Sequence, residues 1–145
     1  MEVKEINHLL TSIFNNVLII EENKLKNSNF PDVTLKEMHT IDAVGEDEAR
    51  TPSQVAKSLM LSTSTITISL NNLEKKGYIE RTRSDSDRRV VYISLTEKGK
   101  LVYKSHKSFH ERMIERFVHD LKEEEVAVMA KGLLNLSRFL EESKK

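Results

Sequence analysis

The segment from residue 63 to residue 76 combines an apolar stripe with an unusual polar face. At about 100° per residue in a helix, Ile66, Leu70 and Leu73 fall on one side and predict a buried face. The opposite side carries hydroxyl and amide groups where a solvated helix would normally show Glu and Lys. Such groups can bond base edges or phosphates, and an exposed isoleucine can meet a thymine methyl group in the major groove.

We therefore predict that this helix and its first turn contact DNA. The residues concerned are Ser62, Thr63, Ser64, Thr65, Thr67, Ile68, Asn71, Asn72 and Lys75. The alternative is that serine and threonine are merely tolerated on a short exposed helix. A short helix and a turn precede this segment and a hairpin follows it, which is the order of a DNA-reading motif and disfavours that alternative.

Two short runs of alternating polarity, Ile79–Arg83 and Val91–Leu95, follow the helix. Because polar residues 84–89 join them, the sequence predicts a hairpin with a charged tip. An arginine on such a tip can enter a narrow A·T-rich minor groove, and a neighbouring carboxylate can hold its guanidinium in place. The residues predicted to contact DNA from this hairpin are Arg81, Arg83, Asp87, Arg88 and Arg89. The sequence does not distinguish Arg88 from Arg89 as the inserted arginine, and the alternative for the tip is a solvated turn.

The charge of the chain is unevenly distributed. The net charge is zero, from 23 basic and 23 acidic residues, and this value alone argues mildly against nucleic acid binding. Residues 75–89, however, contain six basic and three acidic side chains, which gives this window a local excess of three positive charges. The positive charge therefore gathers where the hairpin and the candidate DNA-reading helix meet.

Capping signals divide the chain into helices that would position these residues. Amphipathic helices are predicted at residues 3–27, 34–45, 51–60, 63–76, 97–118 and 122–143. Thr34 and Thr51 each begin a capping box, and Gly77 is a suitable left-handed stop. The predicted fold is mainly α with a small β-hairpin wing: a winged helix-turn-helix at residues 51–95, with an additional short strand between the second and third helices.

Length and composition limit the possible functions. A chain of 145 residues fits one domain, it has no cysteine, and its four glycines form no phosphate-binding loop. We find no catalytic motif and expect a protein that is not an enzyme and needs no cofactor. No apolar stretch approaches the roughly 18 residues that span a bilayer, and we see no signal peptide, so a cytoplasmic location is expected.

Three segments together resemble the MarR family of transcriptional repressors. They are residues 69–79, residues 85–89 in the hairpin, and residues 94–99, which contain a leucine-threonine pair followed three residues later by glycine. The resemblance implies a MarR-like dimer with Thr67, Asn71 and Asn72 in or beside the major groove. It also implies that Arg88 or Arg89 enters the minor groove.

The flanking segments resemble one branch of that family, the repressors of fatty-acid biosynthesis in streptococci and lactic acid bacteria. The similar segments are residues 12–18, 36–42, 109–110 and 129–133. This resemblance implies that long-chain acyl groups on acyl carrier protein act as co-repressor. The candidate lining of an acyl site is Phe14, Val17, Leu18, Met38, Ile41, Phe109 and Met113. Without the resemblance, these residues would be read as plain core.

The three longest predicted helices suggest a homodimer. Their apolar stripes would stay partly exposed on a monomer, and burying them between two copies is favourable. We expect a single domain over residues 1–145, with a DNA-binding lobe at 34–95 and a dimerisation region at 1–30 and 97–145. A dimer would read a pseudo-palindromic, A·T-leaning double-stranded operator whose half-sites lie about one helical turn apart. The alternative is a monomer whose helices pack on the head.

Two further alternatives remain open. His106 and His110 lie one helical turn apart, and a third ligand from His119 or Glu115 would complete a zinc site, although the primary expectation is that no metal is bound. The protein would then be a regulator that senses a metal or another small ligand. In a different class, it would be an adaptor that uses the winged head for protein contacts and does not bind DNA.

Overall fold

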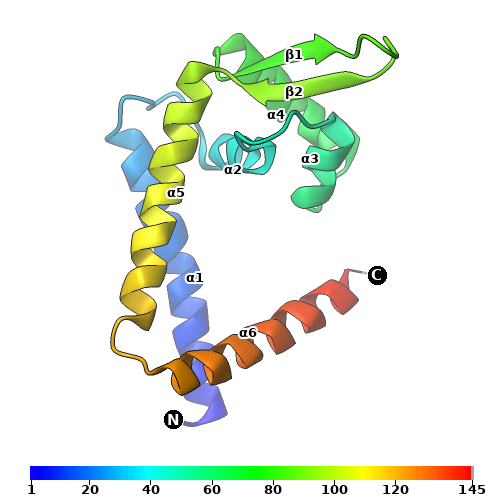
Figure 1. Ribbon diagram of the computed structural model, residues 1–145. Helices are drawn as coiled ribbons and strands as arrows, with labels where there is room; N and C mark the ends of the chain where they lie inside the picture. The colour runs from blue at the N-terminus through cyan, green and yellow to red at the C-terminus, as the bar shows by residue number, and fades with distance from the viewer. Residues whose placement is uncertain (145) are drawn as a thin grey trace. The chain divides into compact units, whose positions relative to one another are not determined.

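The computed structural model describes residues 1–144 and divides the chain into two compact units. The first unit, Met1–Lys107, contains α1 (Val3–Lys26), α2 (Leu35–Val44), α3 (Pro52–Ser58), α4 (Thr63–Lys75), β1 (Ile79–Arg83), β2 (Val91–Leu95) and the first part of α5 (Glu97–Val118). The second unit begins at Ser108 and contains the rest of α5 and α6 (Glu123–Ser143). Figure 1 shows β1 and β2 extending as a hairpin beside α4. The predicted order of helices and the predicted hairpin are confirmed.

The predicted helix starts and stops are present as hydrogen-bonded caps. The Thr34 hydroxyl accepts from the Glu37 backbone N–H at 3.1 Å, and the Glu37 carboxylate accepts in return from the Thr34 N–H at 3.1 Å. Thr51 and Gln54 form the same reciprocal pair at the start of α3. After α4 the chain turns at Gly77, whose φ of 84° is strained for any residue with a Cβ. Local sequence therefore sets these boundaries.

The wing is a two-stranded antiparallel sheet in a single register. Ile79 pairs with Leu95 and Arg83 pairs with Val91. The additional strand predicted between α2 and α3 is reduced to one bridge, in which Arg50 and Ile93 exchange backbone hydrogen bonds of 3.0 and 2.6 Å. The physical reason lies in the next residues, because α3 begins at Pro52 and a proline has no N–H with which to continue a ladder.

The core of the first unit lies between α2, α3, α4 and the hairpin. Its fully buried side chains include Ile66, Leu70 and Leu73, so the predicted inner face of α4 is confirmed. Ile41 of α2 and Ile93 of β2 are equally inaccessible to solvent. This packing leaves the outer face of α4 free, because that face carries none of the core residues.

The segment from Leu95 to Gly99 fastens α5 to the turn between α4 and β1. The Thr96 hydroxyl donates to the Gly77 carbonyl at 2.6 Å and accepts from the Gly99 N–H at 3.2 Å. A Cβ at Gly99 would collide with the backbone carbonyl of Tyr78. The leucine-threonine-x-x-glycine motif thus has a structural explanation: threonine caps α5, and only glycine allows the helix so close to the Tyr78 backbone.

A hydrogen-bonded pair anchors the loop before α2 to the same turn. The Tyr78 hydroxyl donates to the Asp32 carboxylate at 2.6 Å. This bond lowers the pKa of Asp32, and burial, followed by the bond to Asp32, raises the pKa of Tyr78. The turn that follows α4 is therefore held on two sides, by Asp32 and by Thr96.

Candidate nucleic-acid interface

The outer face of α4 is exposed and polar, as a DNA-reading surface requires. Thr67, Asn71 and Asn72 are all exposed to solvent. Ile68 stands among them with 66% of its surface accessible, although burial of an isoleucine normally stabilises a protein. A hydrophobic side chain left in this position is available for an apolar contact with DNA.

Hydroxyl groups form a chain at the first turn of α4. The Ser62 hydroxyl accepts from the Thr65 N–H at 3.2 Å and lies within 3.0 Å of the Ser64 hydroxyl and 2.8 Å of the Thr65 hydroxyl. Thr67 donates its hydroxyl proton to the Thr63 carbonyl at 2.7 Å. Because this donation uses its only proton, Thr67 presents an oxygen that accepts hydrogen bonds.

A side-chain contact between the wing and α4 was missed by the sequence reasoning. The Arg81 guanidinium, from β1, donates to the Glu74 carboxylate at 2.7 Å and to the Asn71 side-chain oxygen at 2.9 Å. Residues 71 and 74 lie one turn apart on α4, which is a sequence signal for neighbours on one face. The sequence pattern could not reveal that Arg81 would lie opposite this face, because that depends on the angle between helix and hairpin.

The two neighbouring arginines at the hairpin tip differ in their hydrogen bonds. Arg89 donates from Nε and from one terminal nitrogen to the two oxygens of Asp87, each at 3.1 Å. This contact lowers the pKa of Asp87, and 91% of the Arg89 side chain still faces solvent. Within residues 1–144, the structure gives the Arg88 side chain no hydrogen bond or ion pair, while its backbone carbonyl accepts from Arg83 at 2.8 Å.

Several charges of the basic window are neutralised by the fold. The Lys76 ammonium contacts both oxygens of Glu37, at 2.8 and 3.1 Å, and Arg81 is paired with Glu74. The positive charge predicted for residues 75–89 is therefore concentrated on Lys75, Arg83, Arg88 and Arg89. This distribution favours phosphate contacts at the rim of the α4 face.

Comparison with known proteins identifies the family. The family model "Transcriptional regulator SarA/Rot" matches residues 24–106, which is more than half of the chain. The chain belongs to the SarA/Rot family of transcriptional regulators. The uncharacterized HTH-type transcriptional regulator YfiV of Bacillus subtilis is 31% identical over 114 residues, which cover 79% of this chain and 71% of YfiV.

Comparison with solved structures identifies the fold. A crystal structure of Streptococcus pneumoniae FabT in complex with DNA is 57% identical, has a TM-score of 0.89 and covers 97% of this chain and 99% of FabT. A MarR family protein from Bacillus stearothermophilus, at 23% identity and a TM-score of 0.72, covers 95% of this chain and 94% of its own and shares the fold. This SarA/Rot family member is thus a DNA-binding transcriptional regulator with the MarR-type winged-helix fold.

The candidate acyl-binding residues of this regulator occupy different environments. Met38 and Ile41 lie in the core of the first unit, whereas Phe14 and Leu18 are exposed on α1, and Val17 beside them is half-buried. Phe109 and Met113 belong to the part of α5 in the second unit. Of these candidate residues, Leu18 lines a groove of about 470 Å³ in the first unit. The full lining of this groove is Leu18, Leu35, Lys36, His39, Thr40, Leu59 and Leu61. The burial of Met38 and Ile41 fits a role in the core, and their part in an acyl site stays a prediction.

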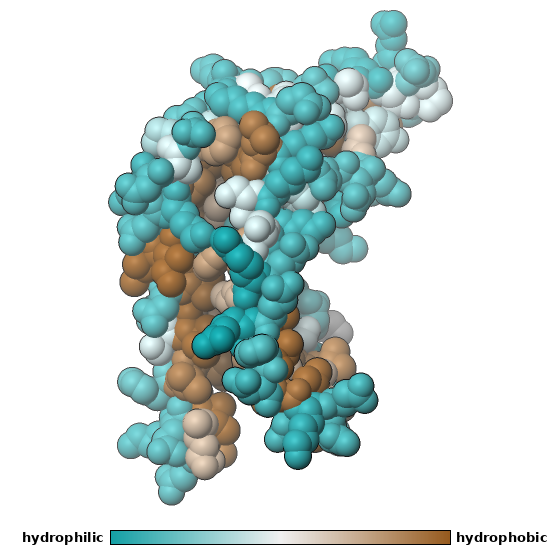
Figure 2. Space-filling model, turned by 60° about the vertical axis from the view of Figure 1, so that its left-hand side comes forward, coloured by the Kyte–Doolittle hydropathy of each residue, from teal (hydrophilic) through white to brown (hydrophobic). Residues whose placement is uncertain are grey.

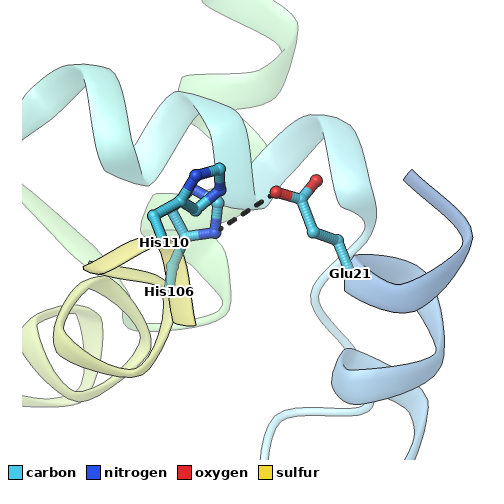
Figure 3. Close-up of side chains that lie close together, drawn as sticks. All are labelled: Glu21, His106 and His110. Atoms are coloured by element: carbon cyan, nitrogen blue, oxygen red, sulfur yellow. Dashed lines mark ion pairs between the residues drawn. The ribbon is translucent and has the colours of Figure 1, made fainter. Parts of the chain in front are cut away.

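His106, a candidate zinc ligand, lies near a residue that the sequence analysis did not consider. Figure 3 shows His106 of α5 facing the carboxylate of Glu21 on α1, with His110 one helical turn further along α5. The His106 Nδ1 lies 3.8 Å from a Glu21 oxygen, and the His39 Nε2 lies 3.1 Å from the other one. Glu21 is only 3% exposed. His119, expected as a third ligand, lies 3.9 Å from Asp120 instead.

No helix within residues 1–144 is both long enough and apolar enough to cross a bilayer.

Proposed function

We propose that this regulator represses genes of fatty-acid biosynthesis by binding their operators as a homodimer, with long-chain acyl groups on acyl carrier protein as co-repressor. The observation that carries the proposal is the exposed α4 face beside a wing whose Arg89 is already held by Asp87. The identity of 57% with a protein crystallised on DNA supports it over almost the whole chain. The resemblance of the flanking segments to repressors of fatty-acid biosynthesis supports the gene class and the co-repressor.

Each part of the surface has a separate role in this proposal. The α4 face enters the major groove, where Thr67, Asn71 and Ile68 meet base edges. The first-turn hydroxyls of residues 62–65 and Lys75 bond phosphates and so set the register of the helix on the duplex. At the wing, Arg89 is the arginine that enters the minor groove, since Asp87 fixes its direction before DNA arrives.

Unpartnered apolar surface on the long helices supports the homodimer. Figure 2 shows broad hydrophobic areas on these helices, and large contiguous apolar patches are uncommon on the surface of monomers. The exposed apolar side chains on α1 and α6 include Ile6, Leu9, Ile13, Phe14, Ile19, Val128, Leu133, Leu134, Phe139 and Leu140. A second copy of the chain would cover them and would place two α4 helices on one operator.

We expect size-exclusion chromatography with light scattering to give twice the mass of the chain at micromolar concentration. Ile13→Asp places a charge on the apolar face of α1 and should shift the protein to a monomer. Asn15→Asp adds the same charge two residues away, at an exposed polar position, and should leave the dimer intact. A wild-type monomer, or equal behaviour of the two variants, would contradict the proposed interface.

The co-repressor is tested by a gel shift on DNA from upstream of fatty-acid synthesis genes. We expect palmitoyl-acyl carrier protein to tighten binding by roughly 5- to 150-fold, the range of typical coupling energies between two sites. Acyl carrier protein with its prosthetic group but no acyl chain is the control and should have no effect. Tight binding of the wild-type protein that neither form alters would leave an operator-binding repressor without this co-repressor.

The second candidate function is metal-responsive regulation, favoured by the cluster of Glu21, His39 and His106. Glu21 is a buried carboxylate with a His39 nitrogen at 3.1 Å and a His106 nitrogen at 3.8 Å, and carboxylate and imidazole are ligand types that zinc uses. For this candidate, isothermal titration with zinc should give saturable heat in the wild type. Glu21→Gln should abolish that heat, and His8→Ala on the same helix should retain it. Heat no larger than that of buffer would eliminate the metal candidate.

A further inference from the structure

Arg81 connects the wing to the DNA-facing side of α4 at one defined point. Its two terminal nitrogens bond Glu74 at 2.7 Å and Asn71 at 2.9 Å. The Arg81 side chain is 26% exposed and that of Glu74 43% exposed, whereas Asn71 lies on the outer face of the helix. The guanidinium therefore contacts the Asn71 side chain, and Glu74 already neutralises its charge.

The chemistry of the guanidinium fixes the orientation of the Asn71 amide. An arginine side chain has only hydrogen-bond donors, so the Asn71 atom that faces it must be the oxygen. The Asn71 nitrogen, with its two donor hydrogens, then points away from Arg81. If the amide turned by 180°, two donors would face each other and the hydrogen bond would be lost.

This orientation limits which bases Asn71 recognises. Bidentate recognition of adenine requires the amide oxygen and nitrogen to face the same base edge, with the oxygen accepting from the adenine amino group. With its oxygen bonded to Arg81, Asn71 offers the groove mainly donors. The matching acceptors in the major groove are the N7 and O6 of guanine and the O4 of thymine.

We propose that Arg81 is a specificity-determining residue that acts through Asn71, holding its amide as a donor and disfavouring adenine at the base that Asn71 reads. This inference rests on the proposed operator reading by α4. It also gives Arg81, predicted from sequence as a direct DNA contact, the role of a positioning residue. Glu74 contributes by keeping the guanidinium in place.

The experiment is selection from a duplex library with a randomised core, using the full-length protein and sequencing the bound DNA. The position at which Asn71→Ala loses base preference defines the base that Asn71 reads. There the wild type should favour guanine or thymine over adenine by about fivefold or more. Arg81→Ala should bring adenine to within about twofold of the preferred base or above it, because the freed amide can turn.

Two more variants separate this effect from general damage. Glu74→Ala removes the other anchor of Arg81, keeps both partners of the bond, and should weaken the same preference. Thr82→Ala, at an exposed neighbouring position on β1, should leave the selected sequence unchanged. Circular dichroism of each variant checks that the protein folds.

The possible outcomes distinguish this inference from the proposed function. If the wild type enriches no sequence at all, operator reading itself fails, and the inference fails with it. If the wild type enriches a motif but Asn71→Ala alters no position, Asn71 reads no base and the inference is overturned. An unchanged base preference at the Asn71 position in folded Arg81→Ala and Glu74→Ala also overturns it.

Discussion

Arg89→Ala is expected to bind operator DNA roughly 10- to 100-fold more weakly than the wild type at physiological salt. The Asp87 carboxylate holds Arg89 through two bonds of 3.1 Å, so the side chain loses little conformational freedom when it enters the minor groove. In a dimer the loss occurs at two wings. Fluorescence anisotropy with a labelled operator measures the effect, and the slope of log affinity against log salt should become less steep.

Arg88→Ala and Asp87→Ala are the matched controls for this prediction. Arg88→Ala removes the same charge from a side chain that no carboxylate of residues 1–144 holds, so we expect a smaller and mainly salt-dependent loss. Asp87→Ala removes a negative charge near DNA, which by charge alone would strengthen binding. If Asp87 orients Arg89, the variant instead binds more weakly. Tighter DNA binding by Asp87→Ala would contradict the orienting role of Asp87. Salt-insensitive DNA binding by the wild type would favour the alternative of a protein-binding adaptor.

Gly99→Ala is expected to lower the free energy of unfolding by about 3 kcal/mol. The added Cβ would collide with the Tyr78 carbonyl, which is backbone and cannot rotate away. The same change would disturb the Thr96 bonds to Gly77 and Gly99. Urea unfolding followed by circular dichroism, at one fixed protein concentration, measures the loss.

Gly132→Ala provides a matched control on α6. Apart from the backbone of α6 itself, a Cβ at this position meets no atom of residues 1–144 within 4 Å, and alanine has the higher helix propensity. The variant should therefore be as stable as the wild type or more stable by up to about 1 kcal/mol. If the two alanine variants unfold at the same urea concentration, the close approach of α5 to Tyr78 does not stabilise the fold.

Much of the fold was predictable because its signals are local. Thr34, Thr51 and Gly77 mark helix ends through bonds to residues a few positions away, and these signals do not depend on the rest of the chain. The period of apolar residues identified the inner face of α4, including Ile66. The additional strand between α2 and α3 is present as one bridge, and the sequence signals provided no measure of its length.

The partners of the polar side chains were not predictable in the same way. Lys76 was counted with the free positive charge, but Glu37 neutralises it from a position 39 residues away. Met38 and Ile41 are buried in the core, and their part in an acyl site stays a prediction, because their pattern on α2 is the same for either role. His106 faces Glu21 of α1, whereas the sequence suggested partners further along its own helix.

The sequence by itself determined the order of the elements and the exposed polar face of α4, because capping, periodicity and hairpin signals operate over a few residues. Only the tertiary structure decided which charged side chains of residues 1–144 have no ion-pair partner and how the polar side chains on the outer face of α4 are oriented. Arg81 reaches Asn71 through the angle at which the hairpin packs on α4. Such angles result from core packing among residues distant in the chain, so no local pattern records them.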